Sequence, residues 1–223
     1  TLTIKSDNNG SLNCESILAG DTNKPRNLSI MGATVETSEI RCCGSLAIEN
    51  SHIAVNNNKI YDAISGNTVS ITDSYVKAKS TEDMASSISS KNGITILGSQ
   101  ILAETGKAFG ENDVIQNVNS SNSVITKKWK DYETKDNVTK TYVYGTATLK
   151  EDLTIASGES IEFESGASIT NPEKLTLADG ASLSVNGEVH THNKDGDVTY
   201  TWKDDKEHIK NVACKDCPIG YVT

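Results

Sequence analysis

The chain has 223 residues, of which 35% are hydrophobic and only 5% aromatic, and a formal net charge of −9. Only two of its 21 basic residues are arginines and no basic stripe is visible, so we expect no nucleic-acid partner. No run of 18 apolar residues exists, so we expect no membrane span.

An imperfect repeat dominates the first half of the chain. Four segments align, LSIMGATV, LAIENSHI, VSITDSYV and ITILGSQI, which begin at Leu28, Leu46, Val69 and Ile94. Each has apolar residues at its first, third and eighth positions, Gly, Asn or Asp at the fifth, and a small residue at the sixth. A strand, a sharp turn and a second strand that recur at a variable period are typical of a β-solenoid.

A third apolar position follows each strand pair, and a further repeat starts at Val124. The third positions are Ile40, Ile64, Ile88 and Val118. Three short strands per coil, with insertions absorbed by one turn, predict a parallel β-helix over residues 1–127. A β-sandwich is the competing interpretation, but it does not place turns at one fixed offset.

Adjacent cysteines lie within this region. Because neighbouring side chains of a strand point to opposite faces, one of Cys42 and Cys43 is expected in the core. A bridge between Cys14 and Cys42 is the alternative to free thiols.

Residues 128–148 interrupt the repeat with a concentration of aromatic residues. Trp129, Tyr132, Tyr142 and Tyr144 alternate with polar residues around a Lys-Asp-Asn turn, which predicts a β-hairpin. Two interpretations remain open for these rings. They cover the end of the solenoid, whose backbone groups would otherwise be unpaired, or they form a surface that stacks on sugars.

A second, tighter repeat occupies residues 149–189. The segment from Leu153 to Thr170 aligns with the segment from Leu175 to His192 at an offset of 22 residues. Turns that contain glycine separate the apolar pairs, at Gly158, Gly166, Gly180 and Gly187. We therefore expect a smaller solenoid here, and an all-β chain with little helix.

The tail, residues 190–223, holds the residues that are best suited to bind a metal. His190, His192 and His208 precede the CxxC pair Cys214 and Cys217, and two imidazoles with two thiolates can close a tetrahedral zinc site. A structural zinc ion, a Cys214–Cys217 disulfide and a tail with no such role stay open as alternatives.

The repeats VSITDSYVKAKS and ITILGSQILAETGKAFG resemble those of secreted, right-handed parallel β-helix proteins of Gram-positive gut bacteria, with pectate-lyase-like solenoids. These are often labelled as carbohydrate-binding-domain-containing or hypothetical surface proteins. The tail is similar to a module of such proteins in which His, Trp and Cys recur in the order His190, His192, Trp202, His208, Cys214 and Cys217. The chain departs from it by lacking a Trp after His208 and a Gly after Cys217.

The resemblance implies a fragment of an extracellular or wall-attached protein, whose signal and anchor lie outside this sequence. We expect a monomeric, non-enzymatic adhesin-like or glycan-binding stalk that needs no cofactor, with a glycan or host-surface ligand. The alternatives are a polysaccharide lyase or glycoside hydrolase on a β-helix, and a structural spacer without a ligand. No P-loop, GxSxG, HExxH or dinucleotide fingerprint occurs in the sequence.

Overall fold

The computed structural model describes residues 1–7, 10–82, 84–104, 107–110, 118–130 and 136–185, and the backbone of three further strands at 188–191, 198–202 and 208–212. Within these ranges every regular element is a β-strand, apart from one 3-10 turn, η1 (Pro172–Lys174). No helix in the described part of the chain is long and apolar enough to cross a membrane. The expectation of an all-β chain is confirmed.

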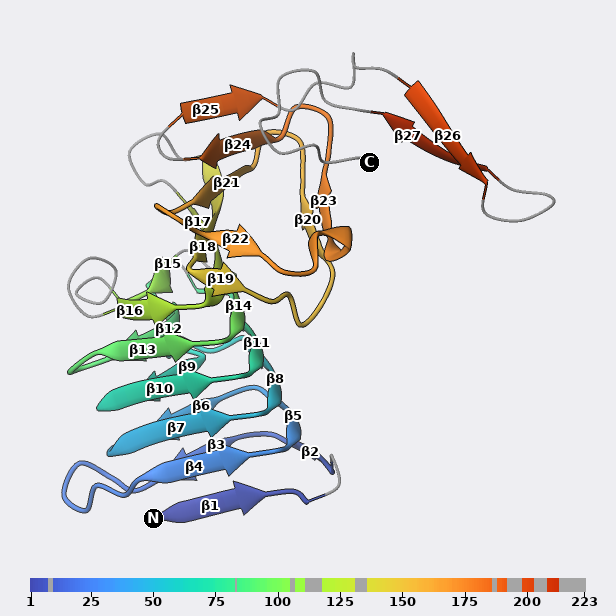
Figure 1. The fold of residues 1–223 in the computed structure, drawn as a ribbon. Coiled ribbons are helices and arrows are strands. Elements are labelled where there is room, and N and C mark those ends of the chain that lie inside the picture. The colour runs from blue at the N-terminus through green and yellow to red at the C-terminus, as the bar shows by residue number, and fades with distance from the viewer. Residues whose placement is uncertain are drawn as a thin grey trace.

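Three parallel sheets form a β-helix in the first half of the chain (Figure 1). Sheet A contains β1 (Leu2–Lys5), β4 (Leu28–Met31), β7 (Ser45–Glu49), β10 (Thr68–Thr72), β13 (Ile94–Leu97) and β16 (Val118–Ser121). Sheet B begins with β2 (Ser11–Cys14), β5 (Thr34–Thr37), β8 (His52–Asn57), β11 (Tyr75–Ser80), β14 (Gln100–Glu104) and β17 (Ser123–Lys130). Sheet C contains β3 (Ile17–Ala19), β6 (Ile40–Cys42), β9 (Ile64–Gly66), β12 (Ser86–Ser90) and β15 (Lys107–Phe109). We call these strands the first solenoid.

Equivalent residues of successive coils pair in the register that the sequence predicts. Leu28 pairs with Leu46, Leu46 with Val69, and Val69 with Ile94. Their side chains are 1% exposed, as is expected when like aliphatic residues stack every ~4.8 Å. The third positions pair in sheet C, Ile40 with Ile64 and Ile64 with Ile88.

Two details of the repeat differ from the prediction. Val118, not Val124, continues the column that starts each coil, because Val118 pairs with Ile94 while Val124 pairs with Gln100 in sheet B. Insertions are absorbed at two corners rather than one. From β4 to β17 the corner from sheet A to sheet B keeps a constant length, while the loops that follow sheet B and sheet C both vary.

The corner from sheet A to sheet B explains the fifth and sixth positions of the repeat. Its first residue has a left-handed backbone with φ between 47° and 62°, at Gly32, Asn50, Asp73, Gly98 and Asn122. Gly, Asn and Asp are the residues that adopt this region most readily, so the positions that the sequence singled out are the ones that turn the chain.

A ladder of serine hydroxyl groups follows these turns, at Ser51, Ser74, Ser99 and Ser123. Each Oγ accepts a hydrogen bond from the backbone N–H of the equivalent residue in the preceding coil, at 3.1–3.3 Å. Each hydroxyl also donates to the carbonyl two residues earlier, at 2.7–2.8 Å. We call these four residues the serine ladder. It joins successive coils where no sheet hydrogen bond is available.

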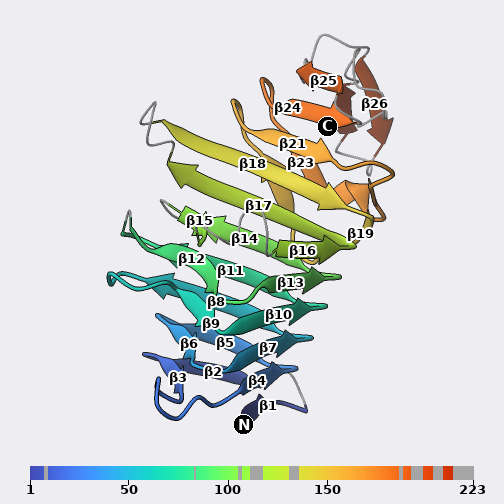
Figure 2. The same cartoon turned by 90° about the vertical axis from the view of Figure 1, so that its left-hand side faces the viewer.

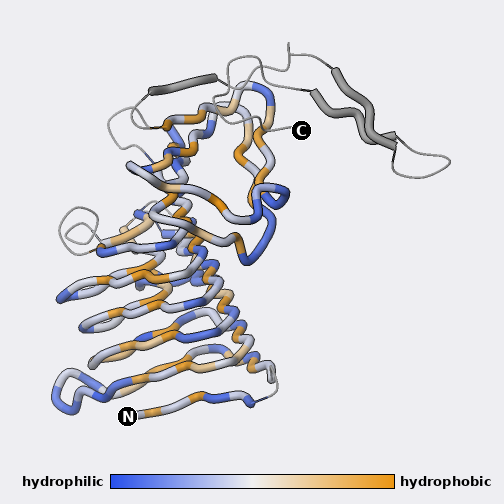
Figure 3. Tube along the Cα trace, viewed as in Figure 1, coloured by the Kyte–Doolittle hydropathy of each residue, from blue (hydrophilic) through white to orange (hydrophobic). Residues whose placement is uncertain are grey.

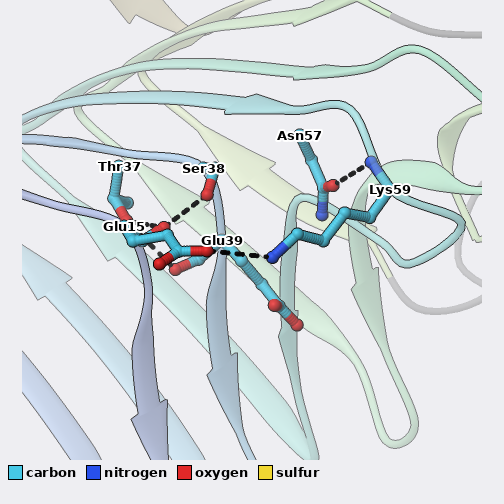
Figure 4. Close-up of polar contacts among 6 residues, drawn as sticks. All are labelled: Glu15, Thr37, Ser38, Glu39, Asn57 and Lys59. Atoms are coloured by element: carbon cyan, nitrogen blue, oxygen red, sulfur yellow. Dashed lines mark hydrogen bonds and ion pairs between the residues drawn. The ribbon is translucent and has the colours of Figure 1, made fainter.

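Side chains also join coils at the corner from sheet B to sheet C (Figure 4). The Thr37 and Ser38 hydroxyls both donate to the carbonyl of Glu15 in the preceding coil. From the following coil, the Lys59 ammonium lies 3.5 Å from the Glu15 carboxylate, and the Lys59 N–H donates to Asn57 Oδ1 at 2.7 Å. This corner is therefore held by polar contacts between neighbouring coils.

The predicted hairpin and second solenoid continue sheet B rather than starting a new one. β17 pairs antiparallel with β18 (Asn137–Tyr144), and the sheet goes on through β21 (Ser160–Phe163), β24 (Ser182–Val185) and the antiparallel β25 (Glu188–Thr191). The remaining pairs are β19 (Thr146–Ala147) with β22 (Ser168–Ile169), β20 (Leu153–Ile155) with β23 (Leu175–Leu177), and β26 (Val198–Trp202) with β27 (His208–Val212). We call β18 to β24 the second solenoid. Leu153 pairs with Leu175 and Ile161 with Leu183, which confirms the 22-residue offset.

The hydrophobic core changes sides at β17. Ile125 belongs to the core of the first solenoid, whereas its neighbour Val124 belongs to that of the second, together with Val143 and Ile161. Alternate residues of 123–126 face opposite sides of the sheet, and all four are buried because each side faces a core. The two views in Figures 1 and 2 show the second solenoid on the other side of sheet B. Apolar residues alternate with polar ones along the strands of both solenoids (Figure 3).

Both solenoids have the same handedness. The coils of the first solenoid rise from the N-terminus in a right-handed sense (Figure 1). At the hairpin the strand direction in sheet B reverses, and the core moves to the opposite face. Reversal of both together leaves the handedness unchanged, which agrees with the strong preference for right-handed crossovers between parallel strands.

The described cysteines are free thiols. Cys42 is buried in the first core and Cys43 is half-buried outside it, as the sequence predicted for adjacent strand residues. Burial raises the pKa of the Cys42 thiol. Cys14 is not bridged to Cys42; its sulfur lies 3.8 Å from the Thr37 hydroxyl.

Candidate functional site

Three of the four aromatic residues that the sequence singles out lie on one face of the β17–β18 hairpin. The three side chains are those of Trp129 in β17 and of Tyr142 and Tyr144 in β18. They lie on the same face of sheet B that lines the first core in the preceding coils. All three are half-buried. Together with Lys127 of β17 we call these residues the hairpin face. Tyr132 lies outside the described residues.

Lys127 stands at the upper end of a core column. In successive coils this column contains Thr37, Val55, Ala78 and Ala103, and Lys127 is the next residue in register. Its ammonium lies 5.3 Å from the centre of the Phe109 ring and 4.8 Å from that of Tyr142. Burial lowers the pKa of Lys127, and the two rings partly replace the lost water as partners of the cation.

Tyr144 closes the same end of the core from β18. Its ring packs against the first core, and the Ser120 side chain of sheet A acts to lower its pKa. The rings of Tyr142 and Tyr144 stack with 6.4 Å between their centres and 27° between their planes. Part of the hairpin face therefore covers the first core, and the rest of each ring faces outward.

Carboxylates border these rings in the second solenoid. Glu162 of β21 pairs with Tyr142 in parallel register, and the N–H of Glu164 donates to the Val143 carbonyl. Burial and the charge of Glu162 raise the pKa of Tyr142. Burial also raises the pKa of Tyr144, as do Glu164 and Glu162, against a lowering hydrogen bond from Ser120. Both phenols thus stay neutral at neutral pH and can donate or accept hydrogen bonds.

This arrangement combines apolar ring surface with hydrogen-bond acceptors. The exposed parts of the two half-buried rings can contact the C–H groups of a ligand, and the adjacent carboxylates can accept hydrogen bonds from hydroxyl groups. The ammonium of Lys127 is directed at rings rather than at solvent, so it offers little attraction to an anionic sugar.

The residues predicted to bind zinc are not brought together by the described structure. His190 lies in β25 and His208 in β27, where only the backbone is described. His192, Cys214 and Cys217 lie outside the described residues. Among the side chains that are described, no three His, Cys, Asp or Glu gather to hold a metal ion. The zinc site remains a prediction.

One buried carboxylate in the first solenoid has the burial that catalytic acids show. Glu39 is 4% exposed, at the corner shown in Figure 4. Its Oε1 makes no hydrogen bond and lies 3.3 Å from Nε of Arg41. The other carboxylate at this corner, that of Glu15, is paired with Lys59 (Figure 4). Both carboxylates are thus neutralised by a cation, which suits a structural role at this corner.

Sequence reasoning missed a second group of residues, on the outward face of sheet B. The seventh position of the repeat places Thr34, His52, Tyr75 and Gln100 side by side in successive coils. Their alignment was visible in the sequence. Their proximity to Lys150 and Glu151, from the loop between β19 and β20, was not, because it depends on the change of core face at β17.

Comparison of the chain with family models, with curated proteins and with solved structures gives no match.

Proposed function

We propose that this chain is a non-enzymatic, glycan-binding part of an extracellular surface protein, in which the first solenoid forms an elongated stalk and the hairpin face holds the sugar. The observation that supports this most directly is the pair of stacked, half-buried rings of Tyr142 and Tyr144 beside the carboxylate of Glu162. Aromatic faces with adjacent hydrogen-bonding groups are what a pyranose ring requires.

The rigidity of the platform supports the same proposal. Both rings project from the continuous sheet B, and Tyr144 also packs against the first core. A ligand that docks on such a surface orders few side chains, so little conformational entropy opposes binding. The net charge of −9 favours neutral glycans over polyanionic ones.

A glycan array probed with the whole chain tests the proposal, with calcium and zinc present and absent. We expect binding to neutral oligosaccharides, and about a twofold to twelvefold loss of affinity in Tyr142→Ala, since a ring contact contributes roughly 0.5–1.5 kcal/mol. Tyr61→Ala is the matched control, because Tyr61 is an exposed tyrosine at a different corner. An array without signal under all conditions would contradict the proposal.

Two alternatives predict different results in simple assays. A polysaccharide-cleaving enzyme would release reducing ends or unsaturated products from pectin, mucin or host glycans. A spacer would neither bind nor cleave. Release of products by the wild-type chain that Glu162→Gln abolishes would replace the binding proposal with the enzymatic one.

The proposal for the tail is a structural zinc ion held by residues among His190, His192, His208, Cys214 and Cys217. Native mass spectrometry of the whole chain tests it. We expect the loss of one zinc-sized mass when a chelator is added, and loss of binding in Cys214→Ser. A mass that does not change with chelator contradicts the zinc site, while a mass two units below the reduced chain indicates the disulfide.

A further inference from the structure

The loop between β19 and β20 of the second solenoid reaches the outward face of sheet B in the first, and this contact creates an inner corner of the molecule. The loop between β19 and β20 lies beside β14 (Figure 1). Gln100 of β14 is 4% exposed, and its Oε1 accepts hydrogen bonds from the backbone N–H groups of Lys150 at 2.8 Å and Glu151 at 3.0 Å. A single buried side chain therefore fixes the position of the loop.

The loop held by Gln100 lies over two neighbouring rings that are tilted relative to each other. His52 and Tyr75 are neighbours in register on β8 and β11, with 4.7 Å between ring centres and 42° between ring planes. The Glu151 carboxylate lies 3.7 Å from Nδ1 of His52. Burial, Glu151 and Glu104 all raise the pKa of Tyr75, so its hydroxyl is neutral at neutral pH.

Polar groups from the left-handed corners border the same open cleft. Asn50 and Asp73 have φ of 47° and 48°, and their exposed side chains line a cleft of about 370 Å³ together with the two rings. Lys150 and Glu151 form its upper wall. This volume lies within the range of small-ligand sites, about 300–1,000 Å³. The cleft thus combines aromatic faces, planar amide and carboxylate groups, and one ammonium group.

We propose that this elbow cleft, formed by Asn50, His52, Asp73, Tyr75 and Glu151, is a second saccharide-binding site that takes a single neutral pyranose unit. The class of ligand in this inference rests on the proposed function. The residues do not, because they belong to other strands and lie on the opposite face of sheet B from the hairpin face. The chain is then bivalent, with one site at each of the two junctions between the solenoids.

The charges of the cleft favour a neutral sugar. Two carboxylates, Asp73 and Glu151, line it against one ammonium, Lys150. A uronate would bring a third carboxylate among them, and a like charge within a few ångströms is unfavourable even when water screens it. The hydroxyl groups of a neutral pyranose instead supply the hydrogen-bond donors that the two carboxylates require.

Titration of the ¹⁵N-labelled whole chain by NMR tests the elbow cleft and the hairpin face separately. The probes are cellobiose, N,N′-diacetylchitobiose, lactose and di-galacturonate. We expect at least one neutral disaccharide to shift the amide signals of residues 73–75 and 150–151, and di-galacturonate to shift them at least tenfold more weakly. Tyr75→Ala is expected to weaken this response about twofold to twelvefold, while Tyr142→Ala leaves it unchanged.

Glu151→Gln and Lys77→Ala complete the design. Glu151→Gln removes one negative charge but keeps a hydrogen-bonding group. We therefore expect a smaller difference in affinity between neutral disaccharides and di-galacturonate in this variant. Lys77→Ala, an exposed outward residue two positions along the strand from Tyr75, is the matched control and leaves every response unchanged.

The outcomes distinguish this inference from the proposed function. Shifts confined to residues 127–144 and 162–164 overturn the elbow site and leave the proposed function in place. Shifts confined to residues 73–75 and 150–151 support the elbow site and overturn the assignment of the hairpin face. Shifts at neither surface overturn both, and a response at the elbow that Tyr75→Ala does not weaken overturns the elbow site.

Discussion

The two solenoids share one ten-stranded sheet, yet they turn their corners by different means. In the first solenoid, a left-handed residue and the serine ladder connect the coils. In the second solenoid, glycine turns at Gly158 and Gly166 have open space around the missing Cβ. Stacked aliphatic columns are common to both. The comparison indicates that coils can stack in register through the aliphatic columns alone. Tight corners add hydrogen bonds between neighbouring coils.

The second solenoid also depends on the first for part of its core. Val124 of β17 and Val143 of β18 pack with Ile161 and Leu183. A solenoid unit cannot bury its apolar face without a neighbour, so these shared strands provide the layer on which the second solenoid stacks. We therefore expect the two solenoids to unfold together.

The largest effects are expected from truncation in the two cores. Ile71 and Ile161 are both fully buried, one in each solenoid. Ile71→Ala and Ile161→Ala are each expected to lower the free energy of unfolding by about 2–5 kcal/mol, because each leaves a cavity. Urea unfolding followed by circular dichroism measures this, with Ser70→Ala and Thr154→Ala as controls at outward positions. A separate early transition in Ile161→Ala would contradict the shared core.

The serine ladder is expected to contribute the next largest effect. Ser74 is 1% exposed, and Ser74→Ala leaves the buried N–H of Ser51 without its acceptor. This should cost about 1–3 kcal/mol of unfolding free energy. Ser70 has an outward position in β10, the strand that precedes this corner, and the unfolding free energy of Ser70→Ala should stay within about 0.5 kcal/mol of wild type. Equal stability of the two variants would show that the ladder does not join the coils energetically.

Glycine substitutions compare the two kinds of corner directly. Gly32 has φ of 62°, and an added Cβ would lie 2.7 Å from the Ser6 carbonyl oxygen. Gly158 has φ of 79°, with nothing within 4 Å of that position. Gly158→Ala should cost about 1–2 kcal/mol from backbone strain alone, and Gly32→Ala should cost measurably more. The same urea measurements decide this, and a larger cost at Gly158 would contradict the account of tight and open corners.

The smallest effect is expected from tyrosine ionisation. The pKa values of Tyr75, Tyr142 and Tyr144 are raised above 10.0, so the folded chain keeps protons that the unfolded chain releases. The free energy of unfolding should therefore fall as the pH rises above 10. The lowered pKa of Lys127 acts in the opposite direction near 10.5. Absorbance titration at alkaline pH should show tyrosines that ionise at higher pH in the folded chain than in the denatured chain. Identical titrations of the folded and denatured chains would contradict the burial of these rings.

The sequence allowed much of the first solenoid to be predicted, because its constraints repeat. Gly, Asn and Asp at the fifth position correspond to left-handed corners, and the pairing of Val69 with Ile94 follows from the alignment. The hydrogen bonds of the serine ladder were not predicted. A small residue at a corner indicates limited space, but not that its hydroxyl reaches the neighbouring coil.

The change of core face at β17 could not be predicted from the sequence. Val124 and Ile125 are both apolar, so both faces of β17 are expected to be buried, but nothing local indicates that the second face belongs to a different core. The same ambiguity led to the wrong assignment of Val124 as the start of a coil. It also concealed the elbow cleft, since His52 and Glu151 approach each other only through this change of face. The hairpin face was found because its aromatic residues alternate within one short segment.

Nuclear Overhauser effects from the methyl groups of Val124 and Ile125 test the central claim most directly. If one sheet carries two cores on opposite faces, Ile125 should show contacts to Ile101 and Val124 should show contacts to Val143, with no shared partners in either core. Contacts from both methyl groups to the same core, or free access of solvent to either residue, would contradict it.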